Sequence, residues 1–555
     1  MAEATAESDT KKPSAISSLA RAVRKDFEIS RYSVFNLDEQ KSRSESWALV
    51  ARPTILGFLA VVAIVLGASQ PGSPFTLKQP GAWFFGIDQP PIVSGSTPAP
   101  TVGLFLGLIG VYGGLFVFMR AWWVLERTTK RNPGISIKVL AVVFMLWVIP
   151  LLMAPPLFSR DSYSYAGQGE MVSQGISPYR YGVNVLGQNA NPYYNQVDPL
   201  WQYTPVPYGP LDLALAGLLM SIAGHKELLM IVLLRVVMGV CGIVAAGVYF
   251  PRIARMLGRD PAQSFTLALL SPVVILHLIG GIHNDALMIG LMLPGLAYAL
   301  GGRPVVGIVL CALAALIKAP AFVAVGFIGW NWPGSDAPLS LRFKYSTYSA
   351  VIALGVMALA TWPTGLGWGW VKDLSAPDAV VSWMAPVTGI GIGLSRISHA
   401  IGLPISGSTL LNVIRKLGTA SSVVAAVYLL VKSHKNNWIR SLGIALILSV
   451  VLSPVVQPWY LSWGLVLLAF SIEGWQKKTC MALAVVSSFV ELPGGRQLLY
   501  QLGAANPIFV VPSVLILGFV LLGPCIPWMA RVKSNFQKVQ ERSVSMVGAK
   551  QSTDI

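Results

Sequence analysis

Residues 137–165 read IKVLAVVFMLWVIPLLMAPPLFSRDSYSY, an apolar run that ends near two prolines and gives way to an acidic, tyrosine-rich segment. The apolar part, 137–157, is long enough to cross a bilayer, since a spanning helix needs roughly 20 residues. The polar segment that follows, 158–208, holds eight of the chain's 17 tyrosines. Tyrosine and tryptophan favour the membrane–water boundary, but interfacial anchoring does not explain Asp161. Its position indicates chemistry at that boundary.

Similar apolar segments recur along all 555 residues, of which 54% are hydrophobic and only 12% charged. The mean hydropathy of +0.62 is far above that of a soluble domain. The sequence therefore predicts an all-α polytopic membrane protein with about 13–15 membrane helices. The expected helices cover residues 54–68, 102–125, 137–157, 228–250, 262–281, 286–300, 304–317, 320–331, 345–363, 409–431, 438–456, 460–473, 480–494 and 506–530.

These helices form one predicted transmembrane domain, 47–530. Disordered tails are expected at 1–46 and 531–555, because both are polar and lack apolar periodicity. The segment 158–208, after the third helix, and a second polar segment, 364–408, are expected to be loops. The cysteines show no metal-binding spacing and are interpreted as core residues; they are Cys241, Cys311, Cys480 and Cys525.

The formal net charge is +17, and the cations are concentrated in short loops between apolar segments. Such clustering sets membrane orientation and does not form the basic stripe of a nucleic-acid-binding protein. If the N-terminus is cytoplasmic, most of the Lys and Arg residues are cytoplasmic too. This predicts a plasma-membrane protein with both termini in the cytoplasm. Four polar or aromatic clusters then meet on the outer face: 158–208, His283–Asp285, 364–408 and Gln457–Tyr460.

Two segments depart from regular crossings. Residues 210–224 are apolar, but a full crossing there would place the cluster Arg252–Arg259 outside the cell. A re-entrant or surface-lying helix is therefore favoured over a spanning one. Residues 304–331 are predicted to be two short helices with a break near Lys318. Broken backbone at membrane depth is tolerated where it is buried in protein or lines a cavity.

Asp161 is the first candidate for chemistry. A carboxylate can take a proton from a hydroxyl as that oxygen attacks an electrophile. The alternative is a structural loop aspartate, paired with neighbouring Arg160. The triplet His283–Asp285 is predicted to form a polar pocket for a sugar or phosphate; a tight hydrophilic turn is the other interpretation.

Lys318 lies in an apolar stretch, where a cation is costly and indicates an anionic partner such as a phosphate. Snorkelling to the interface is the alternative. Arg235 could serve the same anion or make a structural pair, and His277 is interpreted as a core residue. The aromatic elements Tyr203–Tyr208 and Gln457–Tyr460 suit either stacking on sugars or interfacial anchoring. No Walker loop, dinucleotide fingerprint or HExxH motif is present.

Taken in order, Arg160–Tyr165, Tyr208–Pro210, His283–Asp285 and Gln457–Tyr460 resemble the motifs of the GT-C membrane glycosyltransferases. The resemblance covers about residues 50–530. More narrowly, the chain resembles the polyprenol-phosphate-mannose-dependent α-(1→6)-mannosyltransferases of lipomannan synthesis in corynebacteria and mycobacteria. This implies a many-helix GT-C fold with an outer active site and a catalytic extracytoplasmic loop at 158–208.

The resemblance also implies a reaction. The donor would be mannose β-linked to a polyprenyl phosphate, and the acceptor a mannosylated glycolipid whose 6-hydroxyl attacks with inversion. Asp161 would be the base; Glu170 is the nearest further acid in the loop, and no metal cofactor is expected. The expected phosphate-binding residues are Lys318, His283, Arg235 and Arg160. The expected sugar- or acceptor-binding residues are Asn284, Asp285, Tyr163, Tyr203, Tyr208, Gln457, Trp459 and Tyr460.

Two other functions remain open at the level of sequence. A secondary transporter or flippase of lipid-linked sugars would also have many helices, broken segments and a few buried charges. Transporters place ionisable groups near the midplane and often carry repeated halves, whereas the candidate groups here lie at one predicted face. A non-catalytic scaffold would leave Asp161 and Lys318 without a role.

Overall fold

The computed structural model describes residues 41–70, 73, 75, 102–187, 194–334, 336–382, 385–434, 437–494 and 496–497. Residues 1–40 of the predicted N-terminal tail lie outside these ranges. So do the predicted helix 506–530, which contains Cys525, and the predicted C-terminal tail 531–555.

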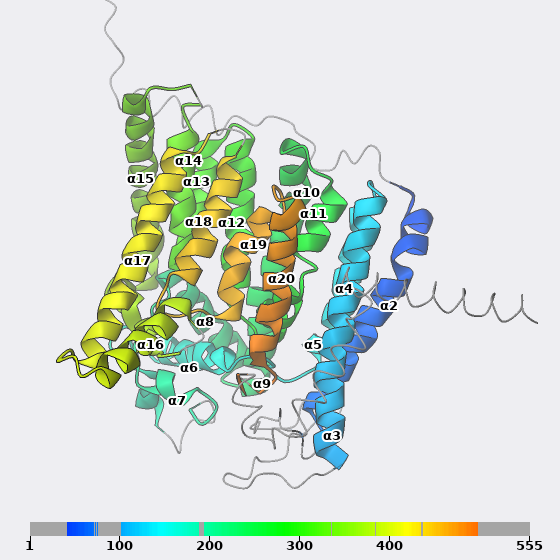
Figure 1. Cartoon of the computed structure of the whole chain (residues 1–555), viewed down its shortest axis with the longest axis horizontal. Coiled ribbons are helices and arrows are strands. Elements are labelled where there is room, and N and C mark those ends of the chain that lie inside the picture. Colours follow the sequence, from blue (N-terminus) through cyan, green and yellow to red (C-terminus); the bar gives the residue numbers. More distant parts are fainter. Residues whose placement is uncertain are drawn as a thin grey trace, which may run out of the picture.

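The described residues form a bundle of upright helices, confirming an all-α polytopic membrane protein (Figure 1). Among them, five helices are long and apolar enough to cross a membrane, or six if one pair bent by 51° is a single span. The long helices are α2 (Arg43–Ala68), α3 to α4 (Val102–Leu108 to Gly114–Arg131), α9 to α10 (Glu227–Leu234 to Gly242–Met256), α15 (Leu339–Thr361) and α17 (Gly407–Val431). The bent pair is α11 (Pro261–Ala268) and the π-helical η5 (Val273–Gly280).

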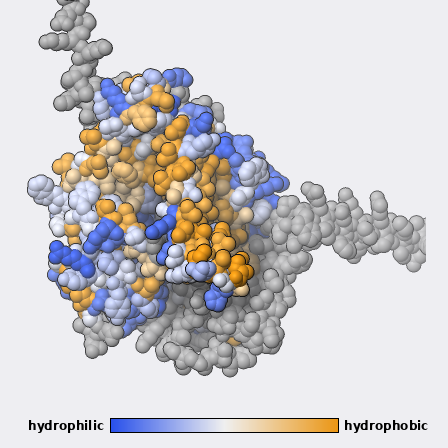
Figure 2. Space-filling view, turned by 60° about the vertical axis from the view of Figure 1, so that its left-hand side comes forward, coloured by the Kyte–Doolittle hydropathy of each residue, from blue (hydrophilic) through white to orange (hydrophobic). Residues whose placement is uncertain are grey.

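Shorter helices complete the bundle. They are α5 (Ile137–Leu152), α12 (Asp285–Leu300), α13 (Pro304–Ala315), α14 (Phe322–Asn331), α18 (Trp438–Val451), α19 (Ser462–Leu468) and α20 (Gly474–Val490). A minimal antiparallel pair, β1 (Glu491–Leu492) and β2 (Arg496–Gln497), follows α20. Hydrophobic side chains form broad patches over the upright helices, and hydrophilic ones gather toward the two ends (Figure 2). This is the surface expected of a protein surrounded by lipid, although the number of crossings stays a prediction.

One end of the bundle carries a group of short helices (Figure 1). They are α6 (Asp161–Ser173), η3 (Val183–Leu186), α7 (Pro199–Gln202), α8 (Pro210–Ala223) and α16 (Pro386–Ala400). The segment 158–208 is thus partly helical. Asp161 is the first residue of α6, where the positive end of the helix dipole stabilises a carboxylate. Helix α8 packs against α6 and has 14 residues, roughly 21 Å, too few to cross the hydrocarbon core.

Two predicted boundaries are wrong. The first helix begins at Arg43, well before 54, so the polar tail does not extend to residue 46. Ser42 and Glu45 form a reciprocal capping box that satisfies the free backbone N–H groups of the first turn. The segment 364–408 is not all loop, because α16 forms within it and packs against α17. Alternating glycines in α16 concealed its helical pattern.

The break expected near Lys318 is confirmed. Helix α13 ends at Ala315, and Lys318 is extended, with φ −150° and ψ 127°. The segment before α8 docks here, since the Gly209 N–H donates to the Ile317 carbonyl at 3.3 Å. A Cβ at Gly209 would overlap the carbonyl oxygen of Leu316, so only glycine permits this approach.

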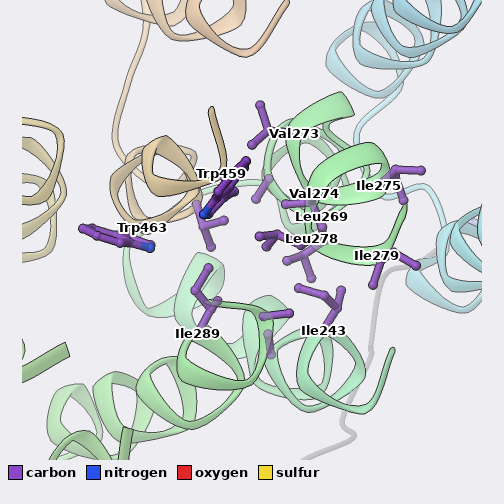
Figure 3. Close-up of a cluster of buried hydrophobic side chains, with 14 of the residues drawn as sticks. Ile243, Leu269, Val273, Val274, Ile275, Leu278, Ile279, Ile289, Trp459 and Trp463 are labelled. Carbon is purple, nitrogen blue, oxygen red and sulfur yellow. The ribbon is translucent and has the colours of Figure 1, made fainter. Parts of the chain in front are cut away.

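The core behind the site is formed by η5, α10, α12 and residues 459–463 (Figure 3). Its buried side chains include Ile243, Val274, Leu278, Ile289 and Trp459. Helices α10 and α12 approach closely, and a Cβ at Gly290 would overlap the Gly242 backbone. Close approach through small residues stabilises helix pairs in membranes, where lipid tails are as apolar as the core and hydrophobic burial drives little association.

Candidate active site

Asp161 lies at the start of α6, at the end of the bundle that carries the short helices. Its backbone N–H donates to the Ser159 hydroxyl at 3.0 Å. Its Oδ2 lies 3.5 Å from Nδ1 of His283, which is completely buried, whereas the Asp161 side chain keeps 19% exposure. Phe158 and Ile282 flank this pair with positive φ values of 66° and 58°. Such strained backbone in non-glycine residues often accompanies functional sites.

Burial raises the pKa of Asp161 to about 6, although the positive charge of Lys318 partly offsets this effect. The carboxylate therefore remains the main form at neutral pH and has a higher proton affinity than an exposed aspartate. A general base works best when its pKa lies near the operating pH.

His283 stacks on Trp459, with ring centroids 3.8 Å apart and an angle of 18° between the planes. Trp459 and Tyr460 begin the short helix η9 (Pro458–Leu461), which follows Gln457. The structure therefore joins three of the four clusters expected to converge. The fourth, 364–408, reaches the same place through Val380.

Lys318 has an anionic partner within the protein, so it is not the lone cation that its sequence context suggested. Its Nζ lies 2.7 Å from Oδ2 of Asp285, the first residue of α12. The same ammonium group lies 4.8 Å from the ring centre of Tyr460 and 5.5 Å from that of Tyr208. Trp463 donates its indole N–H to the other Asp285 oxygen. The Asp285 carboxylate is thus occupied by structural partners, and a direct contact with sugar is not supported.

Asn284 connects four elements. Its Oδ1 accepts hydrogen bonds from Lys318 at 3.3 Å and from the Tyr165 hydroxyl at 3.4 Å. Its Nδ2 donates to Oδ2 of Asp212, in the first turn of α8, at 3.2 Å. Asp212 was not identified from the sequence, although an acidic residue in an apolar helix could have indicated a place in the site. Asn284 and Asp212 are both buried and hold α6, α8, α12 and the break in place.

A cavity of about 600 Å³, counted with its open mouth, lies directly beside Asp161. Its walls come from α6, the segment 201–208, residue 380 and the segment 455–460. The lining residues are Asp161, Ser164, Gln168, Trp201, Thr204, Pro205, Val206, Pro207, Tyr208, Val380, Val455, Gln457, Trp459 and Tyr460. This lining is aromatic and neutral apart from one carboxylate, and it contains no Lys or Arg. Of the residues expected to bind sugar or acceptor, Tyr208, Gln457, Trp459 and Tyr460 line this cavity.

Three expected site residues lie elsewhere. Tyr163 is buried on the side of α6 that packs against α8 and α9. Tyr203 is 66% exposed, and its hydroxyl lies 3.2 Å from that of Tyr194. Arg235 is buried in the π-helical segment η4 (Arg235–Cys241), where its Nη1 donates to the carbonyls at the end of α5. The acceptors Leu151 and Ala154 lie 2.6 Å away. This geometry favours the structural alternative for Arg235.

Arg160 immediately precedes α6 and is partly buried, although it does not line the cavity. Its Nε is buried and makes no hydrogen bond within the described ranges. Glu170 lies ten residues further along, where it accepts from His225 at 2.7 Å and from Gln174 at 2.6 Å. His277 packs against Phe158, with ring centroids 5.4 Å apart, as a core residue would. The described residues contain no cluster of three His, Cys, Asp or Glu side chains suited to a metal ion.

The fold and the site define a membrane-embedded protein with a buried carboxylate beside an aromatic, neutral cavity. Residues 54–334 match the family model described as alpha-(1->6)-mannopyranosyltransferase, N-terminal domain, and residues 387–522 match the MptB C-terminal domain. The chain therefore belongs to the α-(1→6)-mannopyranosyltransferase family of membrane glycosyltransferases.

Named relatives agree with this assignment. The chain is 32% identical to a probable alpha-(1->6)-mannopyranosyltransferase of Mycolicibacterium smegmatis, over 86% of this chain and 89% of the relative. It is 30% identical to alpha-(1->6)-mannopyranosyltransferase A of Mycobacterium tuberculosis, over 79% and 83% of the two chains. It is also 30% identical to alpha-(1->6)-mannopyranosyltransferase B of Corynebacterium glutamicum, over 72% and 69%. No solved structure matches the chain.

Proposed function

We propose that this chain is an inverting mannosyltransferase that moves mannose from a polyprenyl-phosphate-mannose donor to the 6-hydroxyl of a mannosylated glycolipid. The product is the α-(1→6) mannan core of lipomannan and lipoarabinomannan. The observation that carries the proposal is the position of Asp161, which is partly buried at a neutral aromatic cavity and in contact with His283. The match to a B-type C-terminal domain supports a B-type enzyme, although A-type and B-type relatives are equally similar.

The reaction is a single displacement. The Asp161 carboxylate takes the proton of the acceptor 6-hydroxyl while that oxygen forms a bond to C1 of mannose. The bond between C1 and the phosphate oxygen breaks, and its electron pair leaves with the polyprenyl phosphate. Attack from the face opposite the phosphate converts the β linkage of the donor into the α linkage of the product. A phosphate leaving group requires no strong acid, and none of these steps calls for a metal ion.

The phosphate requires positive charge near the site as the bond breaks. Arg160 is the strongest candidate for direct contact, because it adjoins Asp161 and its Nε has no partner within the described ranges. Lys318 supplies positive charge from behind Tyr208 and Tyr460, with Asp285 as its counterion. His283 is completely buried against Asp161 and Trp459, so this scheme gives it no direct contact with the phosphate. Arg235 has no part in this scheme.

The distribution of charge supports the proposed sidedness. The ends of α4 and α10, with Lys130, Arg131 and Arg255, lie at the end of the bundle opposite α6 and α8 (Figure 1). Placing this basic end in the cytoplasm of a plasma-membrane protein puts the cavity on the extracytoplasmic side. The polyprenyl chain then stays in the lipid while its sugar reaches Asp161. Because the site lies at one end of the bundle and away from its middle, the geometry favours transfer over transport.

The test is reconstitution of the purified chain in liposomes with polyprenyl-phosphate-mannose and a panel of mannolipid acceptors. The expected product carries a new α-(1→6) linkage, identified by nuclear magnetic resonance, and chelating agents leave the rate unchanged. A polyprenyl-phosphate-glucose donor and a nucleotide-mannose donor serve as controls. Transfer from the nucleotide sugar alone, or movement of lipid-linked sugar across the bilayer without transfer, would overturn the proposal.

A further inference from the structure

One face of α6 extends from Asp161 into the cavity. Ser164 and Gln168 follow Asp161 by three and seven residues, a spacing that places all three side chains on the same side of a helix. All three line the cavity. The intervening tyrosines point away from it, as Tyr163 packs against α8 and Tyr165 reaches Asn284.

Ser164 and Gln168 are each 5% exposed. The Ser164 hydroxyl oxygen and the Gln168 Oε1 make no hydrogen bond within the described part of the chain. A buried polar atom without a partner costs about 1–3 kcal/mol. Others occur in the described residues, such as Ser162 Oγ and Trp330 Nε1. The Ser164 and Gln168 atoms differ because both residues line one wall of a cavity next to the proposed base, where a ligand can supply the missing partner.

The chemistry of the cavity identifies that ligand. Its other walls present the rings of Trp201, Tyr208, Trp459 and Tyr460 and the amide of Gln457. Aromatic rings pack against the C–H faces of sugars, and neutral hydroxyl and amide groups hydrogen-bond sugar hydroxyls. The lining contains no Lys or Arg, and its one charged group is the Asp161 carboxylate, which would repel a phosphate. The lining therefore favours a neutral sugar over a phosphate as the main occupant.

We infer that this cavity binds the acceptor glycan, and that Ser164 and Gln168 determine which glycan is accepted. The inference rests on the proposed function, because it takes Asp161 as the base that meets the acceptor hydroxyl. At 1.5 Å per residue, Gln168 lies about 10 Å along α6 from Asp161. This distance exceeds one hexose ring. Ser164 therefore contacts the mannose that carries the reacting 6-hydroxyl, and Gln168 contacts the next mannose of the chain.

The test compares a synthetic alkyl α-mannoside with an alkyl α-(1→6)-mannobioside as acceptors, with saturating donor. Gln168→Met keeps the size of the side chain while removing both polar atoms. It should raise KM for the mannobioside about three- to tenfold, the value of one neutral hydrogen bond, and leave KM for the mannoside unchanged. Ser164→Ala should raise KM for both acceptors. KM for the donor should stay constant in both variants.

Ser173→Ala is the matched control, because Ser173 lies on the same helix outside the cavity and donates to the Glu170 carbonyl. It should leave both acceptor constants at the wild-type value. Thermal unfolding provides a second measurement, since removing an unpartnered buried polar atom should keep or raise the melting temperature. A purely structural role for Gln168 would lower the melting temperature and affect both acceptors equally.

The inference is wrong if Gln168→Met changes KM for the donor, or if it changes the two acceptors by the same factor. It is also wrong if Ser164→Ala leaves both acceptor constants unchanged. Failure of the proposed function has a different signature, because the wild-type chain would then transfer mannose to neither acceptor.

Discussion

Asp161 and His283 face each other across two elements that are far apart in sequence, with Oδ2 and Nδ1 3.5 Å apart. His283 Nδ1 makes no hydrogen bond at this separation within the described residues, and catalytic contacts often shorten only when substrate binds. His283 is also stacked on Trp459, which holds its ring in place. The pair therefore joins the start of α6 to the wall of the cavity.

The pH dependence of kcat/KM should report the ionisation of Asp161. Because the carboxylate is the active form, kcat/KM should fall as the pH drops below about 6, the pKa given by its burial. Lys318→Met removes the positive charge that partly offsets the effect of burial on Asp161. The pKa of Asp161 should then rise, and the acidic limb of the profile should move above pH 6. A limb near pH 4, or one unmoved by the substitution, would contradict this account.

The Lys318–Asp285 pair should matter for stability as a unit. Lys318→Met leaves the buried Asp285 carboxylate without its counterion, which typically costs about 3–5 kcal/mol. The double variant Lys318→Met with Asp285→Asn removes both charges and should recover much of that loss. Thermal unfolding in detergent measures both variants. A single variant as stable as the double would show that the pair is not energetically coupled.

Arg160 and Arg235 should give opposite results. Arg160→Ala removes the proposed contact to the donor phosphate and should raise KM for the donor about 10- to 100-fold, the value of a hydrogen bond to a charged group. Its melting temperature should change little. Arg235→Met removes the donors to the Leu151 and Ala154 carbonyls and should lower the melting temperature instead. Steady-state kinetics with varied donor separates the two, and a donor-specific effect of Arg235→Met would restore its predicted role.

Much of the bundle could be predicted because a membrane helix is encoded by a continuous apolar run. The bounds expected for α13 and α17 differ from the observed ones by only a few residues. Helix α16 was missed because its glycines conceal the pattern. The helical turns before residue 54 were missed because their polar residues look like a tail, and only the Ser42–Glu45 capping box marks the start.

The candidate site could be predicted only in part. Polar residues at helix junctions stood out in an apolar chain, and the structure brings Asp161, His283 and Lys318 close to the cavity. It places Tyr163, Tyr203 and Arg235 elsewhere. Whether a buried cation awaits a ligand or already has a partner depends on packing between distant segments. Lys318 forms an ion pair with Asp285 across a helix break. The Arg235 guanidinium donates to backbone carbonyls, and no sequence motif indicates such a bond.

Asp161→Asn should also affect stability, in the direction opposite to its effect on activity. A pKa raised from 3.8 to about 6 means that the ionised group is less stable in the folded protein than in the unfolded chain. This cost is absent below about pH 4 and reaches about 3 kcal/mol above pH 6, at about 1.4 kcal/mol per pKa unit. The asparagine variant should therefore melt at a higher temperature than wild type at pH 7.5, and the gain should vanish at pH 4. A lower melting temperature at pH 7.5 would contradict the burial of a charged carboxylate.

The most direct measurement is the mannosyl transfer rate of Asp161→Asn beside wild type, in the same liposomes, with saturating donor and acceptor and with donor binding measured in parallel. The account predicts a loss of at least about 100-fold in kcat, as expected for removal of a general base, with donor affinity unchanged. Turnover within a few-fold of wild type would show that Asp161 is not the base and would contradict the account.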